Sequence, residues 1–276
     1  MKKIVLIIVP VIVVFFLSCK RNESVLSKGN SVCDSLSMSS QEHLVMSVLW
    51  YQRSAEMRAM YYQSFYLAKL ALDKKLADDK SADKKAVVFD LDETVLDNSP
   101  YEAMMIQKGV DHSNKLWREW TKMAVAKATP GVVDFINYAK SKGVTAFYVS
   151  NREIGDWDVT INNLQKNNLP FADTIHVLLR ASASNDKTPR YDKIAGNYKI
   201  LLTFGDNLRD FKEIFGNRKV NYGFNMADSL KDQYGVNFIM LPNPMYGDWE
   251  KAIYHNTYPS SDVEKSKLRK AALIGY

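Results

Sequence analysis

AVVFDLDETVLD, residues 86–97, is the stretch of sequence that decides the fold. Its first four residues are apolar, and such a short run is typical of a buried strand. The run leads directly into three carboxylates, those of Asp90, Asp92 and Glu93. Burying a carboxylate is costly unless it is paired or bound to a metal. The stretch therefore predicts a core strand that ends at a site able to hold a cation.

Alternating strands and helices follow this stretch. Further strands are expected at residues 144–149, 175–179, 199–204 and 238–241. Helices are expected between and after them, at residues 129–143, 158–167, 189–195 and 208–215. This alternation is typical of βαβ units, so the sequence predicts an α/β fold with a parallel sheet flanked by helices. In such sheets, ligands bind outside the carboxyl ends of the strands.

A small α-helical subdomain is expected beside the sheet. Apolar residues recur at steps of three and four from Leu44 onward, which indicates one long helix, or two in series, to about residue 76. The segment 98–128 contains a helical stretch at 115–127 and no expected strand. We expect residues 41–80 and 98–128 to contribute this subdomain.

The N-terminal residues are typical of an export signal. Residues 1–18 combine a positive start with an apolar run that is short for a membrane span. Cys19 follows as in a lipobox, so it is expected to carry the lipid anchor of a bacterial envelope protein. An ordinary signal peptide or an uncleaved anchor is the alternative. Residues 19–40 are polar and Ser-rich, and we interpret them as a flexible tether.

The charge of the chain excludes one class of partner. The formal net charge of +6 includes Lys2 and Lys3, and the remaining charges of both signs are interspersed. No basic tract stands out, so we expect no nucleic-acid binding and only a mild bias toward anionic substrates.

Residues suited to phosphate chemistry follow each of the first four expected strands. They are Asp90, Asp92, Glu93 and Thr94, then Ser150, Asn151 and Arg152, then Lys187, then Asp206 and Asp210. Clustered carboxylates call for a hard divalent cation, and an all-oxygen site suits Mg²⁺. One carboxylate can attack phosphorus, and a second can transfer the proton. Hydroxyls and an ammonium can hold the phosphoryl oxygens.

The motifs DLDET, YVSNR, SNDKT and GDNLRDF resemble, in this order, the four motifs of the haloacid dehalogenase (HAD) superfamily of phosphohydrolases. WYQRSAEMRAMYYQSF, DNSPYE and LPNPMYGDWE resemble the class C acid phosphatases, which are bacterial lipoproteins of the e(P4) 5′-nucleotidase type. The resemblance covers nearly all of the chain from about residue 40. It implies a HAD-like phosphatase domain over residues 41–276.

The resemblance also implies a role for each matching residue. Asp90 would be the nucleophile and Asp92 the general acid/base. Mg²⁺ would bind the Asp90 carboxylate, the Asp92 backbone carbonyl and Asp206, with Asp210 behind them or bound through water. The substrate would be bound by Ser150, Asn151, Arg152, Lys187 and Tyr246.

Several of these residues have alternative interpretations. For Arg152, membership of a surface ion pair is as good an interpretation as phosphate binding. Tyr246 would stack on a nucleobase, and its alternative is a buried turn aromatic. The family's second stacking aromatic has no clear counterpart here, although His112 is a substitute. Asp97 and Asn98 are interpreted as turn residues, and the tryptophans as packing residues, namely Trp117, Trp120 and Trp157.

We therefore expect a lipid-anchored, Mg²⁺-dependent phosphomonoesterase of the bacterial envelope, at the outer membrane. Its expected substrates are nucleoside 5′-monophosphates and similar small esters, cleaved through an aspartyl-phosphate. The alternatives are a broad-specificity acid phosphatase and a haem- or nucleotide-binding lipoprotein. Assembly as a homodimer is left open by the sequence.

Overall fold

The computed structural model describes residues 41–276, so the expected signal peptide, tether and lipidated Cys19 lie outside the described residues. Five strands form one parallel sheet in the order β5-β4-β1-β6-β7. They are β1 (Lys85–Phe89), β4 (Thr145–Glu153), β5 (Val177–Arg180), β6 (Lys199–Gly205) and β7 (Phe238–Met240). The predicted α/β class and all five predicted strands are confirmed.

The order of the strands determines where a ligand can bind. From β1 the chain adds β4 and β5 on one side, and it then returns to add β6 and β7 on the other. The direction in which strands are added therefore reverses at β1, so that neighbouring connections lie on opposite sides of this strand. A crevice opens at such a switch point, outside the carboxyl ends of β1 and its neighbours.

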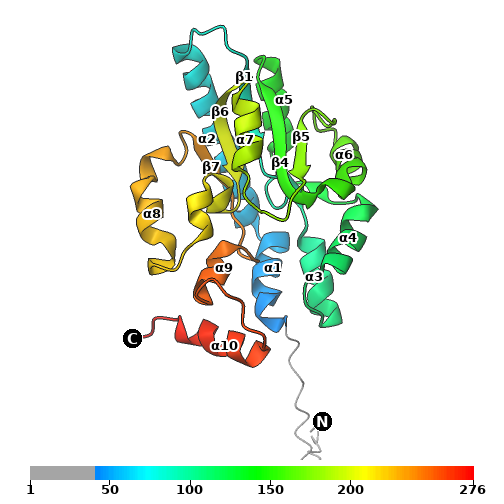
Figure 1. The fold of residues 1–276 in the computed structure, drawn as a ribbon, viewed down its shortest axis with the longest axis vertical. Helices are drawn as coiled ribbons and strands as arrows, with labels where there is room; N and C mark the ends of the chain where they lie inside the picture. The colour runs from blue at the N-terminus through cyan, green and yellow to red at the C-terminus, as the bar shows by residue number, and fades with distance from the viewer. Residues whose placement is uncertain (1–40) are drawn as a thin grey trace, which may run out of the picture. The chain divides into compact units, whose positions relative to one another are not determined.

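Helices flank the sheet (Figure 1). They are α1 (Val45–Arg53), α2 (Ala55–Asp78), α3 (Ser99–Lys108), α4 (Asn114–Met123), α5 (Val132–Ser141), α6 (Trp157–Lys166), α7 (Thr188–Ala195), α8 (Phe224–Ser229), α9 (Asp248–Ile253) and α10 (Asp262–Ala271). The amphipathic segment before β1 forms two helices in series. Ser54 separates them in an extended conformation, and its hydroxyl caps α2 by accepting a hydrogen bond from the Met57 amide.

Alternate residues of β1 supply two separate cores. Val87 and Phe89 belong to the larger core, which also contains residues of α2 and α5. Phe89 stacks on Phe204 there, with ring centroids 4.2 Å apart. Ala86 and Val88 point to the other face and pack in a smaller cluster with residues of β4 and α7. Burial on both faces explains why β1 is apolar throughout and does not alternate in polarity.

The expectation of a strand-free helical stretch at 115–127 was wrong. Helix α4 ends at Met123, because Ala124 adopts a left-handed conformation with φ 49°. The chain then forms β3 (Lys127–Ala128), which pairs antiparallel with β2 (Leu96–Asp97). This short ladder gives hydrogen-bond partners to backbone groups beside the fully buried Leu96. The two strands are far apart in the sequence, so helical periodicity does not reveal their pairing.

The expected helix at 208–215 was also wrong. The chain forms two 3₁₀ turns there, Leu208–Asp210 and Glu213–Gly216. In the first turn, the Asn207 side chain accepts a hydrogen bond from the backbone, and the Asp210 carboxylate accepts one from the Asn207 amide, at 3.0 Å. These reciprocal caps close a single turn and hold Asp210 at the sheet edge.

The segments of the predicted helical subdomain are placed in different ways. Helix α1 packs on α3, and α4 packs on α6, whereas α2 packs against the sheet. The grouping of residues 41–80 and 98–128 into one subdomain stays a prediction. Within residues 41–276, every helix is too short or too polar to cross a membrane.

Candidate active site

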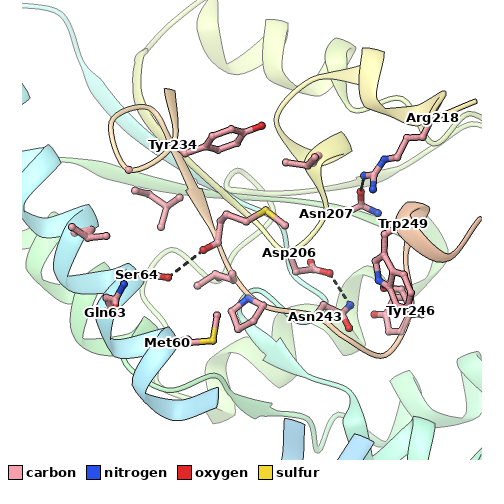
Figure 2. A pocket seen from close by; sticks show the side chains of 17 residues that line it. Met60, Gln63, Ser64, Asp206, Asn207, Arg218, Tyr234, Asn243, Tyr246 and Trp249 are labelled. Atoms are coloured by element: carbon pink, nitrogen blue, oxygen red, sulfur yellow. Dashed lines mark hydrogen bonds between the residues drawn. The ribbon is translucent and has the colours of Figure 1, made fainter. Parts of the chain in front are cut away.

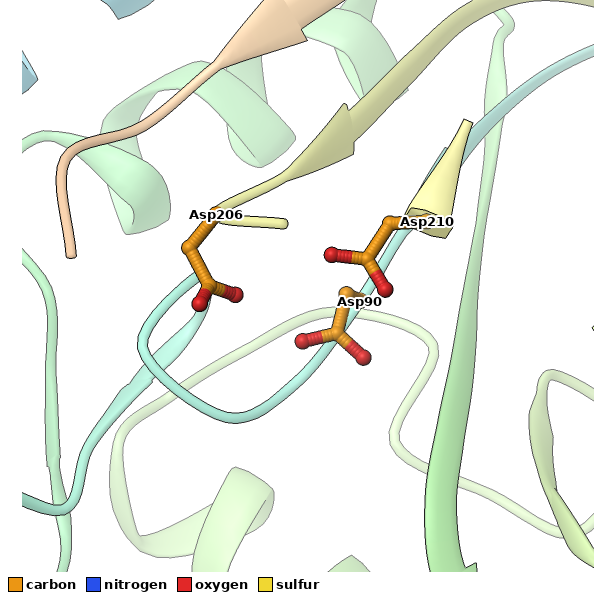
Figure 3. A group of neighbouring side chains, drawn as sticks. All are labelled: Asp90, Asp206 and Asp210. Atoms are coloured by element: carbon orange, nitrogen blue, oxygen red, sulfur yellow. The ribbon is translucent and has the colours of Figure 1, made fainter. Parts of the chain in front are cut away.

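Three carboxylates converge at the carboxyl ends of β1 and β6. Asp90 follows β1 directly, Asp206 follows β6, and Asp210 lies in the adjoining turn. Each offers a ligand oxygen, and these oxygens all lie within 4.8 Å of one another (Figure 3). Asp206 is oriented by two hydrogen bonds, from the Thr94 hydroxyl at 3.1 Å and the Asn243 amide at 2.9 Å. The sequence-predicted acidic residues thus come together, as the topology requires.

Lys187 places its ammonium group inside this cluster. It is buried at the start of α7, where it donates to Asp90 Oδ1 and, at 2.7 Å, to Asp210 Oδ1. Burial opposes its charge, but the Asp210 and Asp90 carboxylates outweigh this effect and raise the pKa of Lys187. The lysine is therefore cationic, and it neutralises part of the charge that the cluster concentrates.

Asp90 and Asp206 lack enough neighbouring positive charge to ionise freely, and a metal ion would supply it. Burial raises the pKa of Asp90 to about 7, against the pull of Lys187. Burial also raises the pKa of Asp206, and the Asp210 carboxylate adds to this rise. Three carboxylates share one ammonium, and their oxygens are the donors that hard divalent cations prefer. The residues present therefore fit a divalent metal ion.

Asp92 is not part of this group of ligand oxygens, although it lines the same cavity, and it forms an ion pair with Arg152. The Arg152 guanidinium donates two hydrogen bonds to Asp92 Oδ1, from Nε at 3.0 Å and from Nη2 at 2.7 Å. The Ser150 hydroxyl donates to Asp92 Oδ2 at 3.2 Å. Arg152 is only 3% exposed, so the interpretation as a surface ion pair was wrong. Its guanidinium also lies 5.7 Å from the ring of Trp117.

Sequence reasoning missed Asn98 as part of the site. Interpreted there as a turn residue, it is fully buried, and its amide donates to Asp92 Oδ1 at 2.9 Å. Its carbonyl oxygen accepts from the Trp120 indole at 2.8 Å, and its backbone amide binds the Glu93 carboxylate. An asparagine before Ser-Pro reads as a turn signal, so the local sequence did not distinguish this role.

Asn151 lies at the end of β4, where a second arginine holds it. Arg190 of α7 donates to Asn151 Oδ1 at 2.7 Å and to the Ser150 carbonyl at 2.5 Å. The Asn151 amide donates to the Asn185 carbonyl at 3.1 Å. Arg190 therefore ties the second and third motif segments together, a role that spacing alone did not reveal.

A cavity of about 840 Å³ leads outward from the carboxylate cluster. Asp90, Asp92 and Lys187 lie at one part of its lining, and residues of α3, α4, α9 and α10 complete it. Trp117 packs edge-to-face on Tyr101, as expected of a packing residue, and it also lines this cavity. His112 also lines it and contacts the Tyr101 hydroxyl through Nδ1 at 2.9 Å.

A second cavity of about 650 Å³ lies between α2 and the ends of β6 and β7 (Figure 2). Its lining is largely apolar and shares Asp206, Asn207 and Tyr246 with the first cavity. Tyr246 therefore stands between the two. Its hydroxyl donates to the Glu93 carboxylate, whose pKa burial raises well above its ordinary value. This contact anchors the ring of Tyr246 at the wall of the first cavity.

The fold and this site define a class of protein. A parallel sheet whose central strand is followed by DLDET, with a buried lysine and two further aspartates beside it, is the arrangement of the HAD-superfamily phosphohydrolases. Comparison with known proteins supports the same class. Residues 18–249 match the family model described as HAD superfamily, subfamily IIIB (Acid phosphatase).

Solved structures agree with the family match. The chain is 40% identical to the class C acid phosphatase from Bacillus anthracis, over 86% of this chain and 99% of that one, with a TM-score of 0.80. A structure of that phosphatase with tungstate bound gives 41% identity over 86% and 98% of the chains, also with a TM-score of 0.80. The chain belongs to the HAD subfamily IIIB acid phosphatases, and it is a phosphomonoester hydrolase.

Proposed function

We propose that this acid phosphatase is Mg²⁺-dependent and that it hydrolyses nucleoside 5′-monophosphates through an aspartyl-phosphate on Asp90. One observation carries the proposal. The Asp90 carboxylate contacts the Lys187 ammonium beside Asp206 and Asp210, in a cavity whose outer wall carries aromatic side chains. This arrangement supplies a nucleophile, a counter-charge and a leaving-group pocket together.

In the first half-reaction, an Asp90 carboxylate oxygen attacks phosphorus. A P–O bond to Asp90 forms as the ester P–O bond breaks, and the bonding electrons pass to the leaving oxygen. Asp92 gives its proton to that oxygen, so the leaving group departs as a neutral alcohol. The Lys187 ammonium offsets the negative charge on the transferred phosphoryl group.

In the second half-reaction, water attacks the phosphorus of the aspartyl-phosphate. Asp92 accepts the proton of the water, and the bond between phosphorus and Asp90 breaks to release inorganic phosphate. Asn98, Ser150 and Arg152 hold the Asp92 carboxylate, and each contacts it directly. We assign the phosphoryl oxygens to Ser150, Asn151, Arg152 and Lys187.

Asp90, Asp206, Asp210 and the backbone carbonyl of Asp92 would hold Mg²⁺. When bound, the ion offsets charge on the phosphoryl oxygens and orients the group for in-line attack. The tungstate-bound structure of the similar Bacillus anthracis enzyme supports an oxyanion site in this family, since tungstate is a tetrahedral oxyanion like phosphate.

Substitution of Asp90 tests the chemistry. Asp90→Asn keeps the shape of the side chain but removes the attacking carboxylate and a metal ligand, so we expect activity to fall by at least about a thousandfold. Hydrolysis is measured with and without Mg²⁺, and circular dichroism checks the fold. A variant that retained a tenth of wild-type turnover would rule Asp90 out as the nucleophile, and full activity in excess chelator would rule out the Mg²⁺ requirement.

Nucleotide preference rests on the aromatic wall. A nucleobase stacked on Tyr246 gains about 1–3 kcal/mol, which is about ten- to a hundredfold in kcat/KM if it is expressed in the transition state. AMP should therefore outperform glycerol phosphate by about that margin, with little discrimination between bases. Tyr246→Ala should remove most of the margin. An equal loss on both substrates would favour the alternative, a broad-specificity acid phosphatase in which Tyr246 is structural.

The cellular context is part of the same proposal. Lipid attachment at Cys19 would hold the enzyme at the bacterial envelope, at the outer membrane. The motif at residues 1–19 supports this placement. Size measurement of the purified enzyme tests whether it forms a homodimer.

A further inference from the structure

Glu102 is a buried carboxyl group without a partner in the active-site cavity. It lies on α3, is only 6% exposed, and is one of the residues that line the cavity of about 840 Å³. Among residues 41–276, no side chain donates a hydrogen bond to its carboxylate or forms an ion pair with it. Among the described residues, only Asp79 and Tyr234 have a fully buried side-chain polar atom without a hydrogen-bond partner, so the Glu102 oxygens reach the open space of the cavity and are accessible to a ligand.

The neighbouring acidic residue has the partners that Glu102 lacks. Glu250 of α9 accepts hydrogen bonds from the hydroxyls of Tyr254 at 2.9 Å and Tyr258 at 3.5 Å. It also lies 4.0 Å from the Arg269 guanidinium. Burial, and then the Glu250 carboxylate, raise the pKa of Glu102 to about 7. Protein groups therefore supply hydrogen bonds to Glu250, whereas any partner of the Glu102 carboxyl group must come from a molecule in the cavity.

The position of Glu102 relative to the reaction defines what its partner is. The cavity contains Asp90 and Lys187 at the phosphoryl site, and it contains Glu102, Met105 and Trp117 on the side of α3 and α4. With phosphate held by the former group, only the leaving group extends toward the latter. Glu102 offers it a hydrogen-bond acceptor among apolar and aromatic neighbours.

The donor that meets Glu102 does not have to be a cation. The C-terminal helices line the same cavity with charges of both signs, those of Lys251, Lys265 and Arg269 beside those of Asp248, Glu250 and Asp262. A neutral hydroxyl group can meet Glu102 without competing for the ion pairs that Lys265 and Arg269 form with Asp262 and Glu250. A carboxyl group that accepts from a sugar hydroxyl is also a common solution in nucleotide-binding folds.

We infer that Glu102 is a specificity-determining residue that accepts a hydrogen bond from a hydroxyl group of the leaving group, so that the enzyme prefers phosphate esters of sugars and polyols. The inference rests on the proposed function in one respect, because it takes this cavity as the leaving-group site. It is independent of any contact with a nucleobase.

Sugar phosphates without a base test the inference directly. The substrates are ribose 5-phosphate and its 2-deoxy and 3-deoxy analogues, each measured as kcat/KM on the full-length enzyme. A site built around a substrate hydroxyl discriminates against the analogue that lacks it. Wild type should cleave at least one deoxy analogue about tenfold less efficiently than ribose 5-phosphate.

Two variants and a control assign that discrimination to Glu102. Glu102→Met keeps the side-chain volume but removes the acceptor, so the ratio should fall to within about twofold of one. Glu102→Gln keeps a carbonyl acceptor and should retain part of the ratio. Glu119→Gln makes the same chemical change on the exposed face of α4, outside the cavity, and should keep the wild-type ratio.

The outcomes separate this inference from the proposed function. Equal cleavage of all three sugar phosphates by wild type would overturn the inference, even if no variant folded. A ratio that persisted in Glu102→Met would overturn it as well. In contrast, equal efficiency on AMP and ribose 5-phosphate would contradict only the nucleobase preference. Hydrolysis of these esters that did not depend on Asp90 would contradict only the proposed chemistry.

Discussion

Glu102→Gln should stabilise the protein at neutral pH, although it is expected to weaken substrate discrimination. The carboxyl group is buried on α3 without a hydrogen-bond partner among the described side chains, beside Glu250. An amide of nearly the same shape carries no charge, so it avoids the cost of burying an ionised group. Stability and function are expected to oppose each other at this residue, as they often do at active sites.

The pKa of Glu102 sets the magnitude and the sign of this effect. Burial and Glu250 raise it from 4.5 to about 7. Because the unfolded chain loses this proton at lower pH than the folded protein, the wild type loses stability as pH rises from about 4.5 to about 7, and the loss is complete above that range. At about 1.4 kcal/mol for each pH unit, the loss amounts to about 3 kcal/mol. The Gln variant does not undergo it.

Urea unfolding of both proteins at about pH 4.5 and pH 8 measures the difference. The free energy of unfolding of Glu102→Gln, relative to wild type, should rise by about 3 kcal/mol between the two conditions. Excess chelator in all samples removes any contribution from bound metal. The exposed-site variant Glu119→Gln shows how much a similar change matters outside the cavity.

One result would refute the reasoning. If the relative stability of Glu102→Gln were the same at both pH values, the Glu102 carboxyl group would titrate as it does in the unfolded chain. It would then be hydrated or paired in solution, and it would not stand ready as an unpartnered acceptor in the cavity.

Three further substitutions test the site and its setting. Gly205→Ala should lower Mg²⁺-dependent activity by at least about tenfold, because the new Cβ would lie 2.5 Å from Asp210 Cβ and displace that carboxylate. A Mg²⁺ titration of activity measures this effect, and a variant that Mg²⁺ activated as strongly as it activates wild type would contradict it. Arg152→Ala should lower the free energy of unfolding in urea by about 3 kcal/mol, since it leaves Asp92 without its buried cation. Asp92→Asn in the Arg152→Ala background should recover part of this loss. An unchanged urea midpoint for Arg152→Ala would show that the ion pair does not stabilise the fold. Cys19→Ala should move the protein out of the detergent phase, whereas equal partitioning of both forms would indicate an uncleaved hydrophobic anchor.

The sequence was sufficient to predict the sheet and the main acidic cluster. A strand that is apolar throughout, separated by helices from others like it, implies a parallel sheet with strand ends at one edge. Because that edge is shared, Asp90, Lys187, Asp206 and Asp210 had to meet although up to 120 residues separate them along the chain. Local periodicity together with a general rule of topology was enough for this part of the site.

Only the tertiary structure decided what surrounds the cluster. Asn98 reads as a turn residue and Trp117 as a packing residue, yet one holds Asp92 and the other also lines the cavity. Glu102 reads as one more polar residue of a helix, and its isolation appears only when α3 and α9 are placed around the cavity. The physical reason is that the sequence pattern of a helix indicates that one face is buried, whereas the groups that meet each side chain come from distant segments brought together by packing.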